Sequence, residues 1–327
     1  MIPEEINEKI IRHAIKAPSQ LNSQPWRFEV EPGLINLLPD FSRSLPTIDP
    51  CNTNLYISLG CVLENLVLTS RQLGYEAIPE IRKLPLYTMV SIKLEEGGKP
   101  DPSGLFDQID HRQVIRSKYA PINISEVLID KLSAESSQEG ILIIPLMQKE
   151  LWTQIIPLIC KGIQILNNQR SYVKEKAQWI RFSEKEAMLK GDGIRSTSLG
   201  HGLSGTRLSK LFISSQFTEK KQVKRWKSLI HHSSGLILFT AKESRNDQWI
   251  KLGSSLQRFV LSLSNAGIQY AHVPLPMEFI LIQKQLAELC GVEGNVPLQL
   301  IRIGKGKPTP YSFRRNIVHN VTRNLHD

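Results

Sequence analysis

The pattern of apolar and polar positions near the N-terminus predicts a helix followed by a β-hairpin. Apolar residues in segment 6–16 recur at helical spacing, and Ala17-Pro18-Ser19 ends that period. Residues 26–30 then alternate between apolar and polar side chains, as in a strand with one buried face. Pro32-Gly33 is a turn sequence, and residues 34–38 supply the partner strand.

A long helix with an apolar face is predicted over residues 54–73. It ends at Gly74, which can adopt the left-handed conformation that closes many helices. Apolar runs at 77–81 and 87–94 then predict two further strands. The first part of the chain therefore has the elements of a small α+β unit.

The segment 95–104, EEGGKPDPSG, can continue neither a helix nor a strand ladder. We take it as the boundary between two halves, residues 1–104 and 105–327. The helix pattern LYISLGCVLENLVLTSRQLGYEA, which starts at Leu55, returns as WIKLGSSLQRFVLSLSNAGIQYA, which starts at Trp249. Both place Leu-Gly early and end in glycine before a strand, which is weak support for an internal duplication when taken alone.

The segment 183–232 differs in composition and is expected to be an insertion in the second half. A long insertion of this kind is often a lid or a binding loop, and a solvated basic surface is an equally good interpretation. Its distinguishing residues are Gly191, Gly193, Gly200, Gly202 and Gly205, followed by Lys210, Lys220, Lys221, Lys224, Arg225 and Lys227.

The totals describe a globular chain of 327 residues, 41% of them apolar, with a formal net charge of +10. The charge favours an anionic partner, such as nucleic acid, a membrane surface or a phosphate-bearing cofactor. No recognised nucleic-acid motif accompanies it, and no apolar run reaches membrane-spanning length. The N-terminus does not resemble a signal peptide, so we expect a cytoplasmic protein without nucleic-acid or membrane partners.

The cysteines and histidines predict neither a disulfide framework nor a metal site. Cys51, Cys61, Cys160 and Cys290 form no CxxC pair and are expected to be buried thiols. His201 and the pair His231-His232 lack a neighbouring carboxylate or cysteine at ligand spacing.

The segment 17–28, APSQLNSQPWRF, places hydroxyl and amide groups in the loop between the first helix and the first strand. Taken alone it is a turn in which Pro25 holds Gln24 extended before Trp26 begins a strand. It also resembles the APSxxNxQPWxF segment of the flavin-dependent nitroreductase superfamily. The resemblance implies that FMN is contacted by Pro18, Ser19, Gln20, Asn22 and Gln24.

A second segment, Arg112-Gln113-Val114-Ile115-Arg116, resembles the RRSxR opening of nitroreductase domains. FMN carries a dianionic phosphate and a pyrimidine edge that gains negative charge on reduction, and guanidinium groups can satisfy both. Two arginines four residues apart are otherwise an ordinary exposed helix face. The resemblance implies a phosphate contact from Arg112, a pyrimidine-edge contact from Arg116 and further contacts from Gln113 and Val114, which depart from the family pattern.

Residues 298–304, LQLIRIG, and 310–315, PYSFRR, resemble the PQLLLRxG strand and the arginine tail of Acg-type FMN-binding proteins. These proteins form an internally duplicated branch of the nitroreductase superfamily. The run 273–278, VPLPME, matches the same branch. The implied contacts are phosphate ligands at Arg314 and Arg315, and backbone near the flavin N5 edge at Pro276 and Met277.

Ordinary nitroreductases are dimers in which each flavin takes its arginine segment from one subunit and its APSxxN loop from the other. Here the first half keeps Ser19 and Asn22, and the second keeps Arg112 and Arg116 but has SSQEG, residues 136–140, in place of the loop. The resemblance therefore implies an α+β nitroreductase-like fold, with a central, mostly antiparallel sheet flanked by helices, duplicated as an intrachain pseudo-dimer. It would hold one complete flavin site, in a monomer or a homodimer.

The function implied by the resemblance is an FMN-dependent oxidoreductase. NADPH, NADH or a substrate would donate electrons, and a small organic molecule would accept them; no catalytic side chain is identified. The rival is a protein that stores or sequesters FMN beneath a lid, with Trp226 or Phe212 packed over the ring.

Overall fold

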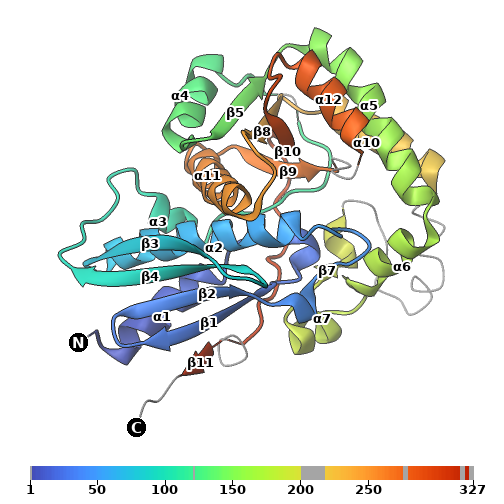
Figure 1. The fold of residues 1–327 in the computed structure, drawn as a ribbon. Coiled ribbons are helices and arrows are strands. Elements are labelled where there is room, and N and C mark those ends of the chain that lie inside the picture. Colours follow the sequence, from blue (N-terminus) through green and yellow to red (C-terminus); the bar gives the residue numbers. More distant parts are fainter. Residues whose placement is uncertain (1, 121, 200–217, 275–278, 317–320, 324–327) are drawn as a thin grey trace.

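The computed structural model describes residues 2–120, 122–199, 218–274, 279–316 and 321–323. These residues form two main β-sheets, and two long helices, α2 (Thr53–Gln72) and α11 (Asn246–Asn265), lie between them (Figure 1). The described pairings within the two sheets are antiparallel except that of β11 (Val321–Arg323) with β1 (Trp26–Glu31). The expected α+β class, with mostly antiparallel sheets flanked by helices, is confirmed.

The first sheet has the strand order β11-β1-β2-β4-β3. Trp26 and Phe28 of β1 are fully buried whereas Arg27 between them is exposed, which is the alternation of a strand with one buried face. The predicted hairpin, helices and strands of this region are confirmed, with ends that differ by a few residues. Its elements are α1 (Glu4–Ala14), β1, β2 (Leu34–Pro39), α2, β3 (Tyr75–Lys83) and β4 (Thr88–Glu96), so that β4 continues two residues into the segment 95–104.

The second sheet has the strand order β5-β8-β10-β9. If the strands of each sheet are numbered along the chain, their order across the second sheet is first, second, fourth, third. The strands β1, β2, β4 and β3 have the same order across the first sheet. In both sheets a long helix joins the second strand to the third. The elements are α4 (Glu126–Ser136), β5 (Ile141–Leu146), β8 (Gly235–Ala241), α11, β9 (Gln269–Val273), α12 (Ile280–Leu289) and β10 (Val296–Gly304).

Helices α2 and α11 pack so closely that the backbones touch at a glycine from each. A Cβ atom built on Gly60 would lie 2.0 Å from the carbonyl oxygen of Ile250. One built on Gly253 would lie 2.0 Å from the carbonyl oxygen of Ile57. The two glycines occupy equivalent positions in the repeated Leu-Gly pattern, and so do the two isoleucines. The contact is therefore the same when the helices are exchanged, as at a two-fold interface.

Two polar pairs, one turn further along the helices, are related by the same exchange of α2 and α11. Arg258 Nε donates to Glu64 Oε1 over 2.8 Å, and Gln257 Nε2 donates to Asn65 Oδ1 over 2.7 Å. In the repeated helix pattern Glu64 corresponds to Gln257, and Asn65 corresponds to Arg258. When each residue is replaced by its equivalent in the other helix, the pair Glu64–Arg258 becomes the pair Gln257–Asn65.

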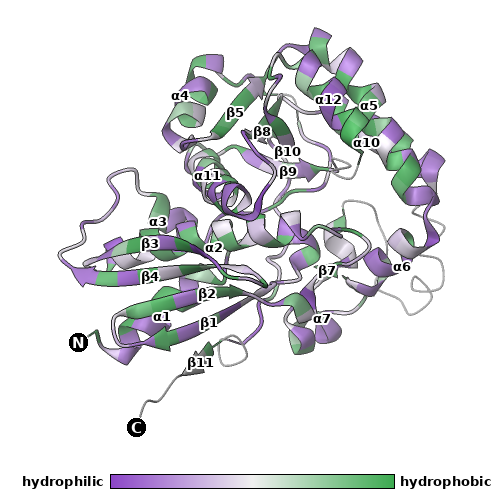
Figure 2. Cartoon of the chain, viewed as in Figure 1, coloured by the Kyte–Doolittle hydropathy of each residue, from purple (hydrophilic) through white to green (hydrophobic). Residues whose placement is uncertain are grey.

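Two large apolar clusters hold these layers together. The larger lies between the sheets and includes Trp26, Phe239 and Phe259, all fully buried. The smaller, around Trp152, covers the other face of the second sheet beneath α5 (Lys149–Asn168), α10 (Glu219–His231) and α12. In Figure 2, β5 and β8 carry the hydrophobic colour, whereas α7 (Glu184–Lys190) carries both colours.

The predicted insertion, residues 183–232, lies in the chain between β5 and β8. The excursion between these two strands starts earlier than predicted, with α5. Residues 200–217, which include Phe212, lie outside the described residues. Trp226 of α10 packs against the smaller apolar cluster. The remaining elements are the short α3 (Leu105–Gln108) and, between β5 and β8, α5, α6 (Arg170–Gln178), the strand pair β6 (Ile180–Arg181) and β7 (Ile194–Arg195), α7 and α10.

Two local expectations are wrong. Gln24 is left-handed, with φ 53°, instead of extended, because its backbone N–H bonds to Ser19 and its side-chain amide to Gly191. Cys51 is exposed, because it lies in the loop that precedes α2, whereas Cys61 and Cys160 are buried. Across the described ranges, no helix combines the length and the apolar character needed to cross a bilayer.

Candidate cofactor site

A cavity of about 650 Å³ lies beside the first turns of α2. The loop before β1 forms one wall, and the ends of β9 and β10 form another. Leu166 of α5 and Tyr172 of α6, from the chain between β5 and β8, also line it. Cofactor and substrate sites typically have volumes of roughly 300 to 1,000 Å³. The cavity is therefore large enough for a cofactor and draws on both sheets.

The walls of the cavity combine apolar surface with basic side chains. Ile57, Trp249 and Leu298 supply apolar surface, and Arg116 and Lys176 are the basic residues that line it. Burial and the nearby Arg225 lower the pKa of Lys176 to about 8. Such a cavity suits a ligand that combines an apolar body with negative charge.

Arg116 is the predicted arginine that reaches the cavity. Within the described part of the chain its guanidinium has no hydrogen-bond or ion-pair partner. Burial lowers its pKa, and the charges of Arg112 and Arg302 add to this effect, whereas Tyr270 and Tyr119 oppose it. The group remains a cation at neutral pH and can hold an anionic or carbonyl oxygen of a ligand.

The backbone on both sides of Arg116 is fixed by Arg302. Arg302 is fully buried, and its Nη2 donates to the carbonyl oxygens of Ile115 (3.1 Å) and Ser117 (2.7 Å). Its guanidinium also stacks on the Tyr119 ring, 4.0 Å from the centroid. Arg302 thus positions the loop that presents Arg116 to the cavity.

Pro18, Ser19 and Gln20 of the predicted loop also line the cavity. Ser19 Oγ accepts the backbone N–H of Gln24 over 2.9 Å, which closes the loop on itself. Gln20 Oε1 is buried and has no hydrogen-bond partner among the described residues. An unpartnered buried acceptor is costly, so this amide is available to a ligand.

Asn22, Gln24, Arg314 and Arg315 come together, but in a network beside the cavity instead of in its lining. Asn22 Nδ2 donates to the carbonyl oxygens of Gly193 (3.0 Å) and Phe313 (3.1 Å). Arg314 Nη1 donates to Asn22 Oδ1 over 3.1 Å, and Arg315 N donates to Gln24 Oε1 over 2.9 Å. The network ties the loop to the C-terminal tail.

Arg314 and Arg112 also bind carbonyl groups of the turn that follows α1, and they share that of Lys16. Arg314 donates to Ile15, Lys16 and Ala17, and Arg112 Nη2 donates to Lys16 over 3.0 Å. Burial and the charge of Arg112 lower the pKa of Arg314 to about 9. These guanidinium groups therefore satisfy the free carbonyls of the turn that follows α1.

The remaining predicted contacts have other surroundings. Arg112 Nη1 donates to Tyr270 Oη over 2.8 Å, and its Nε is buried with no partner among the described residues. Gln113 Nε2 donates to the carbonyl oxygen of Thr309 over 2.9 Å, and Val114 forms a bridge to Tyr270. Pro276 and Met277 lie outside the described residues.

The polar residues of the cavity wall that sequence reasoning missed include Asn54, His272 and Gln299. His272 Nδ1 lies 3.2 Å from Gln299 Oε1, and Gln299 Nε2 donates to Asn54 Oδ1 over 2.6 Å. Burial, together with the charges of Arg116 and Arg112, lowers the pKa of His272 to about 4, although the bond to Gln299 acts in the opposite direction. Two signals were present in the sequence: His272 directly precedes the matched run 273–278, and Gln299 lies inside the matched run 298–304.

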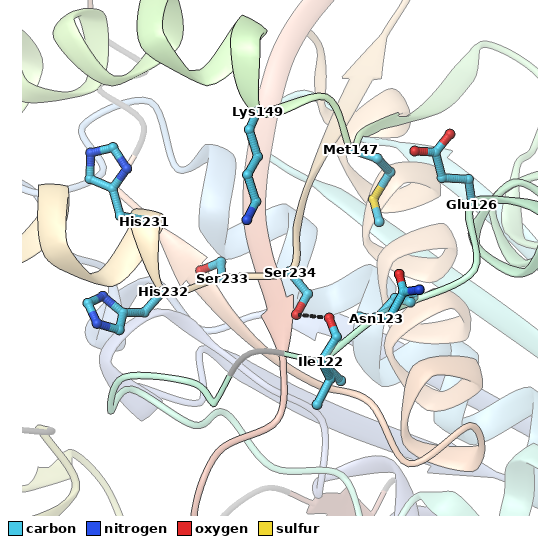
Figure 3. A pocket seen from close by; sticks show the side chains of 10 residues that line it. Ile122, Asn123, Glu126, Met147, Lys149, His231, His232, Ser233 and Ser234 are labelled. Carbon is cyan, nitrogen blue, oxygen red and sulfur yellow. Dashed lines mark hydrogen bonds between the residues drawn. The ribbon is translucent and has the colours of Figure 1, made fainter.

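A second cavity, of about 340 Å³, lies at the end of α10 (Figure 3). Lys149 extends toward Ser233 and Ser234, and the Ser234 hydroxyl donates to the carbonyl oxygen of Ile122 over 3.0 Å. His231 and His232 at its rim are exposed. It contains no predicted cofactor contact. Across the described part of the chain, no cluster of histidine, cysteine or acidic residues could hold a metal ion.

The sequence matches no protein-family model. It is 34% identical over 68 residues to a predicted NAD(P)H nitroreductase of Mycobacterium tuberculosis, present in two strains. The match covers 21% of this chain and 20% of that protein, so the chain spans about a fifth of the length of the curated relatives it matches.

Several solved flavoproteins share a weak structural similarity. A BluB-like flavoprotein from Clostridium difficile has a TM-score of 0.43 and 16% identity, over 66% of this chain and 95% of the other. Iodotyrosine deiodinase bound to FMN and 3-iodo-L-tyrosine has a TM-score of 0.41 and 12% identity, over 65% and 95%. A nitroreductase with bound FMN from Bacteroides fragilis has values of 0.40 and 9%, over 65% and 94%. Similarities at this level are too low to carry a family assignment.

Proposed function

We propose that the chain is an FMN-dependent oxidoreductase of the nitroreductase type, with one flavin held between two related halves, residues 1–104 and 105–327. One observation carries the proposal: Ser19 and Gln20 from the first half and Arg116 from the second line the same cavity. These residues belong to the two motifs that resemble the nitroreductase superfamily and are far apart in sequence. The matching strand orders and the exchangeable contact of α2 with α11 support the duplication.

The cavity suits FMN by the chemistry of its walls. Arg116 offers cationic donors, Gln20 offers an unpartnered buried amide oxygen, and Ile57 and Trp249 offer apolar surface for a ring. The binding residues would be Pro18, Ser19, Gln20 and Arg116. Bound FMN would supply two-electron transfer from NADPH, NADH or a substrate to a small organic acceptor.

The other predicted contacts act, in this proposal, by shaping the site. Asn22, Gln24, Arg314 and Arg315 hold the loop that carries Ser19 and Gln20. Arg112 fixes the end of α1 against Tyr270, and Arg302 fixes the backbone around Arg116. A rigid set of this kind orients a ligand because each binding side chain is held by packed neighbours.

Storage or sequestration of FMN is the second candidate, favoured by one observation. Leu166, Tyr172 and Lys176 belong to the chain between β5 and β8, and all three line the cavity. This part of the chain therefore forms a wall of the site and can restrict access to a bound flavin. Trp226 packs against the second sheet instead of lining the cavity, so it is not assigned to a cover over the ring.

The absorption spectrum of the purified protein tests both candidates. We expect a flavin spectrum, about one FMN per chain after release, and bleaching by anaerobic NADPH or NADH. A flavin spectrum that neither donor bleaches would favour sequestration. A colourless protein that does not bind added FMN would contradict both.

A matched pair of variants tests the role of Arg116. Arg116→Ala should raise the Kd for FMN by about tenfold or more, because an ionic hydrogen bond at a buried site is lost. Lys118→Ala removes an exposed cation two residues away and should leave the Kd within about twofold. Equal effects from the two variants would assign the loss to general charge instead of to the cavity.

A further inference from the structure

Three side chains of the cavity wall, those of Asn54, Gln299 and His272, form a hydrogen-bonded chain. Asp49, in the loop before α2, accepts the backbone N–H of Leu55 over 3.0 Å and so holds the first turn of the helix that carries Asn54. The side-chain oxygen of Asn54 faces Gln299.

The two bonds of this chain run in one direction, from His272 toward Asn54. Asn54 Oδ1 can only accept, so Gln299 turns its amide nitrogen toward it, at 2.6 Å. Gln299 Oε1 then faces His272 Nδ1 at 3.2 Å, and that nitrogen must carry a hydrogen. His272 is thus held as the tautomer with a proton on Nδ1, which leaves the Nε2 lone pair as an acceptor.

The surroundings keep His272 in this neutral form. Burial and the positive charges of Arg116 and Arg112 all disfavour the imidazolium. Within the described part of the chain, Nε2 has no hydrogen-bond partner. The cavity therefore presents a neutral acceptor on His272 and a cationic donor on Arg116, which are close enough for the charge of Arg116 to act on His272.

We propose that His272 Nε2 accepts a hydrogen bond from the imide N–H of the flavin, while Arg116 donates to an oxygen on the same pyrimidine edge. This edge alternates carbonyl, N–H and carbonyl, so it needs an acceptor between donors. The inference rests on the proposed function, because it assigns His272 a place in the same FMN site. In this arrangement His272 favours a flavin that has an N–H at its pyrimidine edge over one that lacks it.

The test compares two ligands, FMN and FMN methylated at N3, titrated into the flavin-free protein and followed by quenching of flavin fluorescence. The wild type should bind FMN at least about tenfold more tightly than the methylated flavin. His272→Asn keeps a donor for Gln299 but loses the Nε2 acceptor. It should weaken FMN binding by about tenfold and bring the ratio of the two Kd values toward one.

His272→Phe keeps the volume of a ring without either nitrogen and should also weaken FMN binding, which separates loss of the acceptor from loss of bulk. His232→Asn, at an exposed histidine of the other cavity, should leave both Kd values within about twofold. Equal affinities for the two flavins in the wild type, or an unchanged ratio in both His272 variants, would overturn this inference and leave the proposed function standing. Failure of the folded wild type to bind either flavin would overturn both.

Discussion

Arg302 combines two opposing effects at the scale of a single residue. It is a buried cation whose Nε and Nη1 have no partner among the described residues, and that is unfavourable for folding. Its Nη2 nevertheless bridges the carbonyls on both sides of Arg116, and its guanidinium stacks on Tyr119. Because Arg302 is unfavourable for folding, we infer that its role is to hold the loop that presents Arg116 to a ligand.

Arg302→Met should therefore separate stability from affinity. The variant loses two hydrogen bonds but also removes a buried charge, so the free energy of unfolding should change by less than about 2 kcal/mol. The Kd for FMN should rise by about tenfold, because the Arg116 loop is no longer held. Urea unfolding and flavin titration measure the two effects, with Arg27→Met at an exposed position as the control. Unchanged affinity would remove Arg302 from the site.

His272 gives the flavin-free protein a pH-dependent stability. Its folded pKa of about 4 lies below its ordinary value of 6.5, chiefly because of burial. As pH falls from about 6.5 toward 4, the unfolded chain takes up the proton while the folded chain does not, so stability decreases. Each pKa unit corresponds to at most about 1.4 kcal/mol.

His272→Asn should lose this dependence. As the pH is lowered from about 7 to about 5, the free energy of unfolding of the wild type should therefore fall more than that of the variant. Urea unfolding of both flavin-free proteins at the two pH values measures it. A difference that does not change with pH would mean that His272 titrates normally in the folded protein.

At this scale the sequence located the loop but did not predict its geometry. The three residues Leu21, Asn22 and Gln24 have φ values of 52°, 54° and 53°, a conformation that costs non-glycine residues roughly 1 to 3 kcal/mol each. Ser19 supplies one compensating bond from within the loop, but the others come from Gly191, Gly193 and the tail, which the local sequence cannot indicate. His272, Asn54 and Gln299 were missed for the same reason: they become neighbours only after the chain has folded.

At the scale of the elements, the α2–α11 contact is the most demanding feature of the fold. Gly60→Ala would place its Cβ 2.0 Å from the carbonyl oxygen of Ile250, and backbone atoms cannot move aside as a flexible side chain can. The two helices would have to separate, so we expect a loss of at least about 3 kcal/mol.

Gly253→Ala should cost a similar amount, because its Cβ would meet Ile57 in the equivalent way. Lys251→Ala, on the same helix, should change the free energy of unfolding by less than about 1 kcal/mol. Denaturant unfolding compares the three variants. A large loss from one glycine variant and none from the other would contradict the exchangeable contact.

The elements of the first half and the second long helix were predictable, since strong periodicity marks the hairpin and both long helices. The repeated Leu-Gly pattern also indicated which positions correspond, although it could not show that the two glycines touch. The chain between β5 and β8 was less predictable. The glycines and lysines of residues 183–232 marked that segment as an insertion. The sequence did not show that α5 belongs to the same excursion, because its apolar residues resemble those of any core helix.

For the whole molecule, contacts between the halves are numerous and come from distant parts of the sequence. β11 pairs with β1, Arg314 bonds to the end of α1, and Gln299 bonds to Asn54. Motif order alone suggested a shared site, because each half carries one of the two matching segments. Only the structure places Ser19 and Arg116 in the lining of one cavity.

These contacts predict that the chain can be cut at the 95–104 loop without losing its site. Residues 99, 100 and 102–104 are exposed, and interruptions at such places are tolerated when the pieces share a large interface. Fragments 1–99 and 100–327, made together, should copurify on a tag carried by one of them and bind about one FMN per pair. Neither fragment alone should bind FMN, because each lacks one wall of the cavity. A single fragment that binds flavin, or a pair that binds two, would contradict one shared site, since the α2–α11 interface would then join two independent binding units.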